Sequence, residues 1–246
     1  MRKGDETGRR ATAGHLEGAD IAIRRSASSR YFSSGSSGLD QLLGGGYRTG
    51  TMTEFFGRSN SGKSQLAMQA ALEAAVKGDG VLYVDTEGGF RPERLEQIAR
   101  ARGWQTDGAL QRVIFVRSDS AAEQVETVRR MQSRSVTAGC RLVIVDTLTR
   151  NFSLDLPGKA NLPSRQGSLG VHLSEMARDA YLNERAYLLT NRVTFGPTKD
   201  VGVGGKTVEQ LVHASVLLER QGTAVKATAL GSGSQAVLQM GAAGVI

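Results

Sequence analysis

The sequence is poor in cysteine and histidine and contains no long apolar run. No apolar stretch approaches the ~20 residues that a membrane-spanning helix needs, and the N-terminal residues lack the apolar core of a secretion signal. The single cysteine, Cys140, cannot form an internal disulfide, and the apolar run after it favours a buried structural thiol. The three histidines lie far apart without cysteine partners, which excludes a zinc cluster of ordinary spacing. We therefore expect a soluble cytoplasmic protein that does not bind membranes.

Composition predicts one sizeable domain, because the chain has 246 residues and 39% of them are hydrophobic. Residues 1–33 are polar, rich in Gly, Ser and Arg, and without sustained periodicity, so we predict a flexible basic arm before a folded domain over 34–246. The formal net charge is +7, which fits a polyanion such as nucleic acid as partner. Because the excess is spread along the chain, an ordinary solvated basic surface explains the charge equally well.

The strongest motif is the octapeptide from Gly57 to Ser64, which matches the phosphate-binding pattern G-x-x-x-x-G-K-[ST] at every fixed position. Its glycines let backbone N–H groups point at phosphate oxygens, Lys63 reaches the β- and γ-phosphates, and the Ser64 hydroxyl can bind Mg²⁺. A strand-like segment over 50–56 precedes the motif and a helix-like segment over 65–76 follows it, as the motif requires. The predicted nucleotide-binding residues are Gly57, Arg58, Ser59, Asn60, Ser61, Gly62, Lys63, Ser64 and Gln65.

Four further apolar runs, at 81–84, 113–116, 142–145 and 187–189, predict strands. The runs are continuous rather than alternating, as expected of strands buried on both faces, and the segments between them can hold helices. Beyond residue 214, three short runs separated by glycine-bearing turns predict an antiparallel meander. The predicted fold class is therefore α/β, with a mostly parallel central sheet flanked by helices and a C-terminal antiparallel meander.

Two carboxylates follow strands at the edge where open α/β sheets bind ligands. Asp146 ends the run 142–145 and is expected to support Mg²⁺ beside Ser64, with a turn or helix-capping aspartate as the alternative. Glu87 lies just past the run 81–84 and can orient the water that attacks a γ-phosphate, unless it is a plain loop carboxylate. We predict Glu87 and Lys63 as the catalytic residues.

Five segments carry a further resemblance: TEFFG at 53–57, SGKSQL at 61–66, YVDTEG at 83–88, FRPER at 90–94 and LVIVD at 142–146. Over about residues 34–246, the chain resembles the ATPase core of archaeal RadA recombinases, their RadB-type paralogues and their eukaryotic counterparts. The resemblance implies a RecA-like P-loop NTPase fold with ATP and Mg²⁺ as cofactors, Arg94 stacked on adenine, and Asn191 and Arg192 at the nucleotide. It also implies two DNA-facing loops, 150–166 and 192–206, whose cations are Arg150, Lys159, Arg165, Lys199 and Lys206.

The chain departs from the family pattern at several positions. Arg192 stands where recombinases usually place a glutamine between the γ-phosphate and DNA. We expect Arg192 to bind phosphate or a carboxylate such as Glu87, with an arginine turned to solvent as the alternative. Ser153 and Leu156 replace the arginine and tyrosine of the first DNA-facing segment. The arm lacks the Phe-x-x-Ala segment that joins recombinase subunits, and the loop 231–233 replaces the segment that caps a neighbour's ATP.

These features together favour an ATP-binding, DNA-associated protein of homologous recombination and DNA repair, located at the nucleoid. Its ATPase is expected to be weak and modulated by DNA, and its role that of an accessory or mediator paralogue of the RadA recombinase. The expected partners are single-stranded DNA, a RadA-type recombinase and a second copy of the chain. Two alternatives stay open. One is the strand-exchange recombinase itself, and the other is a KaiC-like signalling ATPase, which the TEFFG and FRPER segments fit less well.

Overall fold

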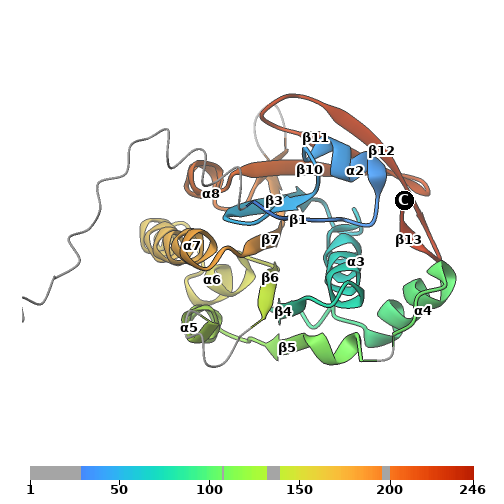
Figure 1. Cartoon of the computed structure of the whole chain (residues 1–246). Helices are drawn as coiled ribbons and strands as arrows, with labels where there is room; N and C mark the ends of the chain where they lie inside the picture. Colours follow the sequence, from blue (N-terminus) through green and yellow to red (C-terminus); the bar gives the residue numbers. More distant parts are fainter. Residues whose placement is uncertain (1–28, 107, 132–138, 196–199) are drawn as a thin grey trace, which may run out of the picture.

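A nine-stranded sheet forms the centre of the computed structural model, which describes residues 29–106, 108–131, 139–195 and 200–246 (Figure 1). The strand order is β13-β12-β11-β10-β3-β7-β6-β4-β5. Strands from β10 to β5 in this order are parallel, whereas β10 to β13 are antiparallel neighbours. The bounds are β3 Thr51–Gly57, β4 Gly80–Asp85, β5 Val113–Arg117, β6 Cys140–Asp146, β7 Ala186–Asn191, β10 Ala214–Gln221, β11 Ala224–Ala229, β12 Gln235–Gly241 and β13 Gly244–Val245.

Helices cover both faces of this sheet, and Figure 1 shows the two layers on opposite sides of it. One layer contains α2 (Ser37–Leu42), α3 (Lys63–Val76) and α4 (Pro92–Arg102). The other contains α5 (Ala121–Met131), α6 (Arg150–Asp155), α7 (Leu162–Asn183) and α8 (Gly205–Leu211). The remaining elements are β1 Tyr31–Phe32, β2 Tyr47–Arg48, η1 Leu110–Arg112, β8 Val193–Phe195 and β9 Asp200–Gly202.

The central strands bury both of their faces, which confirms the interpretation of the continuous apolar runs. In β4, Val81 and Tyr83 pack in the core under α3, while Leu82 and Val84 pack in the core under α7. Because successive strand side chains point to opposite faces, a strand covered by helices on both sides must be apolar throughout. The parallel α/β core and its C-terminal antiparallel strands are as predicted. Cys140 is buried at the start of β6, and burial raises the pKa of its thiol.

The prediction of two buried faces is wrong for β5. This strand is the last of the sheet, with β4 as its only strand neighbour among the described residues. The side chains of Ile114 and Phe115 are 40% and 45% exposed, although the Phe115 ring packs 4.9 Å from that of Phe90. An apolar run indicates a strand but carries no information on whether the strand lies at the centre or the edge of its sheet.

Regular structure also occurs in segments that the sequence predicted as irregular. The first segment predicted to face DNA, 150–166, contains α6 and the start of α7, and the second, 192–206, contains the β8–β9 hairpin and the start of α8. The predicted arm lies mostly outside the described residues, but at its end β1 pairs with β2 and buries Phe32. Among the described helices, none combines the length and apolarity needed to span a bilayer.

Candidate nucleotide site

The predicted phosphate loop joins β3 to α3, and its glycines stand where other residues would not fit. A Cβ on Gly57 would lie 2.4 Å from the Leu218 carbonyl oxygen, and Gly62, which directly precedes α3, has a φ of +97°. No side chain of the described residues caps α3, so the N–H groups of its first turn can bind an anion. The loop therefore fits a chain of phosphates.

Lys63 places its ammonium over this loop. Its Nζ donates hydrogen bonds to the carbonyl oxygens of Gly57 at 2.9 Å and Arg58 at 2.8 Å. Burial lowers the pKa of Lys63, and the nearby carboxylates of Asp146 and Glu87 partly offset that shift. A partly buried ammonium beside free helix N–H groups is the arrangement that binds β- and γ-phosphates.

Asp146 meets Ser64 beside the loop, at the carboxyl end of β6. Asp146 Oδ1 accepts hydrogen bonds from Ser64 Oγ at 3.1 Å and from Thr190 Oγ1, while Oδ2 accepts one from Tyr83 at 2.7 Å. Burial raises the pKa of Asp146, although the three hydroxyl hydrogen bonds favour the ionised form and lower it. Mg²⁺ binds through one or two protein oxygens together with substrate phosphates, so a hydroxyl beside a carboxylate fits this metal.

Glu87 lies in a tight turn held by the buried carboxylate of Asp85, the last residue of β4. Asp85 Oδ1 accepts hydrogen bonds from the backbone N–H of Glu87 at 2.9 Å and of Gly88 at 2.7 Å, and Oδ2 accepts one from that of Phe90 at 3.0 Å. The register of β4 beside β6 pairs Asp85 with Asp146. The turn thus brings Glu87 to the carboxyl ends of the strands, where Asp146 and the phosphate loop also lie, as predicted.

Arg192 follows β7 directly and binds Glu87. Its Nε and Nη2 atoms lie 2.9 and 2.8 Å from Glu87 Oε1. This carboxylate is one of the two partners predicted for Arg192. The Arg192 side chain is 56% exposed, so the pair lies at the solvent side of the site, where electrostatic attraction is partly screened.

A protein-family model described as Rad51 matches residues 25–237 of the chain. The chain belongs to the Rad51 family. It is 36% identical over 208 residues to the DNA repair and recombination protein RadA of Ignicoccus hospitalis, covering 80% of this chain and 62% of that relative. It is also 36% identical over 197 residues to the DNA repair and recombination protein RadA of Aeropyrum pernix, covering 78% and 60%. The chain thus spans about 60% of the length of these curated relatives.

Membership of the Rad51 family confirms the resemblance to RecA and RadA proteins and, with the sheet described above, the RecA-like core. The family and the relatives belong to homologous recombination and DNA repair. The same matches are expected of a recombinase and of an accessory paralogue, so the RadB-type assignment stays a prediction.

Arg94, the predicted adenine-stacking residue of this Rad51-family core, connects α4 to the phosphate-loop helix. Its Nε donates to Gln65 Oε1 at 2.9 Å, and its Nη2 donates to the Gly241 carbonyl oxygen at 2.7 Å. The planar guanidinium therefore lies between α3 and the end of β12. This position is compatible with a base stacked on it, and the stacking itself stays a prediction.

Asn191 belongs to a buried polar network that sequence reasoning missed. Its Nδ2 donates to Glu54 Oε1 and to the Val203 carbonyl oxygen, both at 2.7 Å, and its Oδ1 accepts from Thr149 Oγ1 at 2.7 Å. Burial raises the pKa of Glu54, and its second oxygen accepts from Ser215 Oγ at 2.9 Å. The acidic residue Glu54 inside the apolar strand β3 is the sequence feature that could have indicated this network. A direct contact of Asn191 with ATP stays a prediction.

The predicted DNA-binding cations of the Rad51-family core differ in their surroundings. Lys159 and Lys206 are exposed, whereas the half-buried Arg165 donates to the Leu156 carbonyl oxygen at 3.0 Å. Arg150 turns toward the sheet edge, where its Nη1 donates to the Thr86 carbonyl oxygen at 2.6 Å. The fifth, Lys199, lies outside the described residues. The two exposed lysines are therefore better placed than the two arginines to meet a phosphate backbone.

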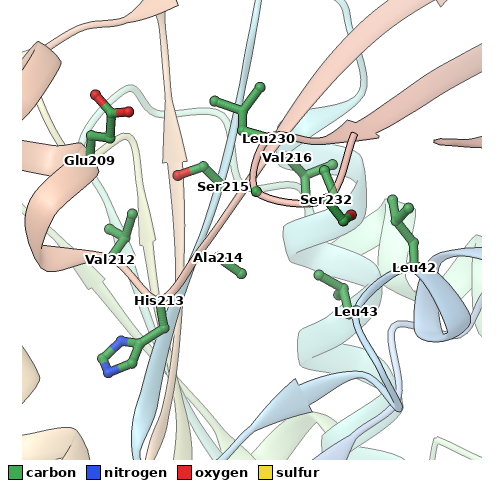
Figure 2. Close-up of a pocket in the computed structure, with 12 residues that line it drawn as sticks. Leu42, Leu43, Glu209, Val212, His213, Ala214, Ser215, Val216, Leu230 and Ser232 are labelled. Carbon is green, nitrogen blue, oxygen red and sulfur yellow. The ribbon is translucent and has the colours of Figure 1, made fainter. Parts of the chain in front are cut away.

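A separate hollow of about 370 Å³ lies between α2, the end of α8, β10 and the turn 229–232 (Figure 2). Figure 2 shows Leu42 and Leu43 on one side of it and His213 and Val212 on the other. No phosphate-loop residue lines it. The hollow meets the buried network at Ser215, whose hydroxyl binds Glu54. Gly231 and Ser232 also line it, and they belong to the segment 231–233 that is predicted to replace the family's ATP-capping loop.

Proposed function

We propose that the protein is an ATP-binding, DNA-associated accessory or mediator paralogue of a RadA-type recombinase, acting in homologous recombination and DNA repair. Its ATPase is weak and modulated by DNA. Its partners are single-stranded DNA, a RadA-type recombinase and a second copy of the chain, in the cytoplasm at the nucleoid. The observation that carries this proposal is the Arg192–Glu87 ion pair at the predicted nucleotide site, where Ser64 also binds Asp146.

Nucleotide binding is supported by the uncapped start of α3 and by the ammonium above it. The phosphates would bind to the loop N–H groups and Lys63, and Ser64 with Asp146 would hold Mg²⁺, partly through water. Bound Mg²⁺ would supply positive charge to offset the charge that develops on the phosphates. Lys63 would add its own positive charge there, while Arg94, which donates to Gln65, would orient the nucleoside end together with Gln65.

Weak hydrolysis is supported by the partner of Glu87. A carboxylate that orients an attacking water must present a lone pair to that water. Arg192 Nε donates a hydrogen bond to Glu87 Oε1, and Arg192 Nη2 lies 2.8 Å from the same oxygen. The guanidinium therefore competes with water for Glu87 and restrains the carboxylate. Hydrolysis proceeds when Arg192 leaves Glu87 or when the other carboxylate oxygen reaches the water.

Partner binding is supported by the exposed edge of the sheet. Among the described residues β5 has β4 as its one strand neighbour, so the N–H and C=O groups on its outer side can accept an added strand from another chain. The exposed side chains of Ile114 and Phe115 add apolar surface to this edge. An extended apolar segment of a recombinase or of a second copy would fit it. This supports an accessory role, in which the chain joins an assembly that another protein forms.

The test is ATP hydrolysis with and without single-stranded DNA, followed by a strand-exchange assay alone and with a RadA-type recombinase. We expect slow hydrolysis, a change of rate with DNA, no strand exchange by the protein alone and a change in the recombinase's own rate. Strand exchange by the isolated protein would assign it to the recombinases. Hydrolysis unaffected by DNA, with no effect on the recombinase, would favour the signalling ATPase.

A further inference from the structure

Three pairs of consecutive residues form a closed ring of contacts beside the nucleotide site. Arg150 Nη1 donates to the Thr86 carbonyl oxygen at 2.6 Å. Thr149 Oγ1 donates to Asn191 Oδ1 at 2.7 Å. Arg192 binds Glu87 at 2.8 Å. The peptide chain closes the ring between these contacts, because its members are the neighbours Thr86 and Glu87, Thr149 and Arg150, and Asn191 and Arg192.

Hydrogen bonds of Thr86 hold the buried side of this ring against the end of β6. Thr86 is fully buried, and its Oγ1 accepts from the Thr147 backbone N–H at 2.8 Å and donates to the Thr147 carbonyl oxygen at 2.9 Å. Its own N–H donates to the Asp146 carbonyl oxygen at 2.8 Å. Thr149 and Asn191 are buried as well. Hydrogen bonds in such a buried setting hold their partners firmly.

Arg150 contacts the peptide bond that carries Glu87. The oxygen of that peptide bond belongs to Thr86 and accepts from Arg150, while its N–H belongs to Glu87 and donates to Asp85 at 2.9 Å. Both polar ends of one peptide bond are therefore held by charged side chains. Hydrogen bonds with one charged partner are roughly twice as strong as neutral ones, so this pair sets the plane from which the Glu87 side chain extends.

Arg150 is also the first residue of α6, where the first DNA-facing segment begins, and Arg192 is the first residue of the second. We propose that Arg150 is a positioning residue for ATP hydrolysis, which acts by orienting the peptide bond between Thr86 and Glu87 and thereby joins the first DNA-facing segment to the catalytic carboxylate. The inference rests on the proposed ATPase. It replaces a direct DNA contact as the main role of this arginine.

The test compares Arg150→Met, which keeps the length of the side chain and removes its donors, with Arg150→Lys, which keeps the charge and a donor. Arg141→Met is the matched control, because Arg141 Nη1 also donates to a backbone carbonyl oxygen, that of Asn183 at 3.2 Å, at the opposite end of β6. Each variant is assayed for kcat and KM for ATP without DNA, after thermal unfolding has established that it is folded.

We expect Arg150→Met to lower kcat about tenfold to a hundredfold, the cost of a misplaced catalytic group, with KM for ATP nearly unchanged. Arg150→Lys is expected to recover part of that loss, and Arg141→Met to behave as the unmodified protein. Unchanged kcat in a folded Arg150→Met protein, with a loss of DNA affinity alone, would overturn the inference and return Arg150 to the DNA-binding cations.

A double-mutant cycle with Glu87→Gln distinguishes failure of the inference from failure of the proposed function. If Arg150 acts through Glu87, Arg150→Met lowers kcat in the unmodified protein and has no further effect on the Glu87→Gln protein. Equal losses in both backgrounds would overturn the positioning role and leave the proposed ATPase intact. A Glu87→Gln protein that hydrolyses ATP at the unmodified rate would instead overturn the assignment of Glu87, and the inference with it.

Discussion

Arg192 binds Glu87 through two nitrogen atoms that both approach one carboxylate oxygen, Oε1, at 2.9 and 2.8 Å. Arginine keeps its charge and only donates, whereas the glutamine usual at this position in recombinases is neutral and both donates and accepts. A glutamine can exchange partners when the γ-phosphate leaves, but an arginine paired with Glu87 gains little from doing so. From this contact we expect both slow hydrolysis and weak communication between nucleotide and DNA.

Lys63→Ala is expected to abolish or strongly weaken ATP binding without unfolding the chain. The ammonium contacts loop carbonyl groups at the predicted phosphate position and does not belong to the apolar core, so its removal should leave the core intact. Calorimetric titration with Mg-ATP measures the affinity, and thermal unfolding checks the fold. Unchanged affinity in a folded Lys63→Ala protein would remove the phosphate-loop assignment.

Arg192→Gln is expected to raise the rate of ATP hydrolysis about threefold or more, because Glu87 is released toward water. Arg129→Gln is the matched control, since Arg129 forms an ion pair with Glu175 at 2.8 Å between α5 and α7, outside the contacts described for the nucleotide site. The steady-state rate of ATP hydrolysis is measured for the unmodified protein and for both variants. A slower Arg192→Gln protein would assign Arg192 to the phosphate during catalysis, in place of a restraint on Glu87.

Acidification is expected to destabilise the protein through His172. Burial lowers the pKa of His172 from 6.5 to about 4, with Glu175 raising it and Arg129 lowering it further. Between pH 6.5 and pH 4 the folded state therefore binds fewer protons than the unfolded state. The stability that the neutral His172 contributes is complete above pH 6.5 and is lost as the pH falls toward 4. The loss amounts to about 3 kcal/mol.

His172→Leu isolates this contribution, because leucine cannot be protonated and has a similar volume. The free energy of unfolding by urea is measured for both proteins at pH 7 and pH 4. The unmodified protein should lose more stability than the variant between the two values. An equal loss would show that His172 is accessible to protons in the folded state.

DNA binding is expected to be largely electrostatic and to depend on the basic N-terminal segment. Deletion of residues 1–28 removes cations while leaving the ion pair between Arg30 and Asp79, at 2.6 Å, intact. We expect lower affinity for single-stranded DNA and a salt slope reduced by about one unit, because each phosphate that a protein neutralises contributes roughly 0.7 to the slope. Fluorescence anisotropy at several salt concentrations measures both. Identical slopes would leave Lys159, Lys206 and their neighbours as the source of binding.

The sequence predicts those parts of the fold and site that depend on local rules. The phosphate loop follows from fixed glycines and a lysine, and the position of Asp146 follows from the end of a buried strand. The partner of Arg192 was also within reach, because the sequence offers few carboxylates at that edge. In each case, the residue type and its position relative to a strand largely determine where the side chain lies and which groups it can contact.

Other features depend on which segments meet in space. The exposure of Ile114 and Phe115 depends on β5 being the last strand, and strand order is not contained in an apolar run. The sequence indicates a DNA-facing cation at Arg150, but the carbonyl oxygen of Thr86 comes within its reach only when β4 and β6 pair. The link between Glu54 and Asn191 likewise joins residues 137 positions apart.

The affinity for single-stranded DNA in the ATP-bound and ADP-bound states tests the role of Arg192 most directly, with a non-hydrolysable ATP analogue as the first ligand. We expect the two affinities to agree within about threefold, because Arg192 keeps its bond to Glu87 in both states, and we expect Arg192→Gln to widen the difference. If the unmodified protein bound DNA tenfold or more tightly with the ATP analogue, a coupling of about 1.4 kcal/mol, the role of Arg192 would be contradicted and the protein would be better described as a recombinase.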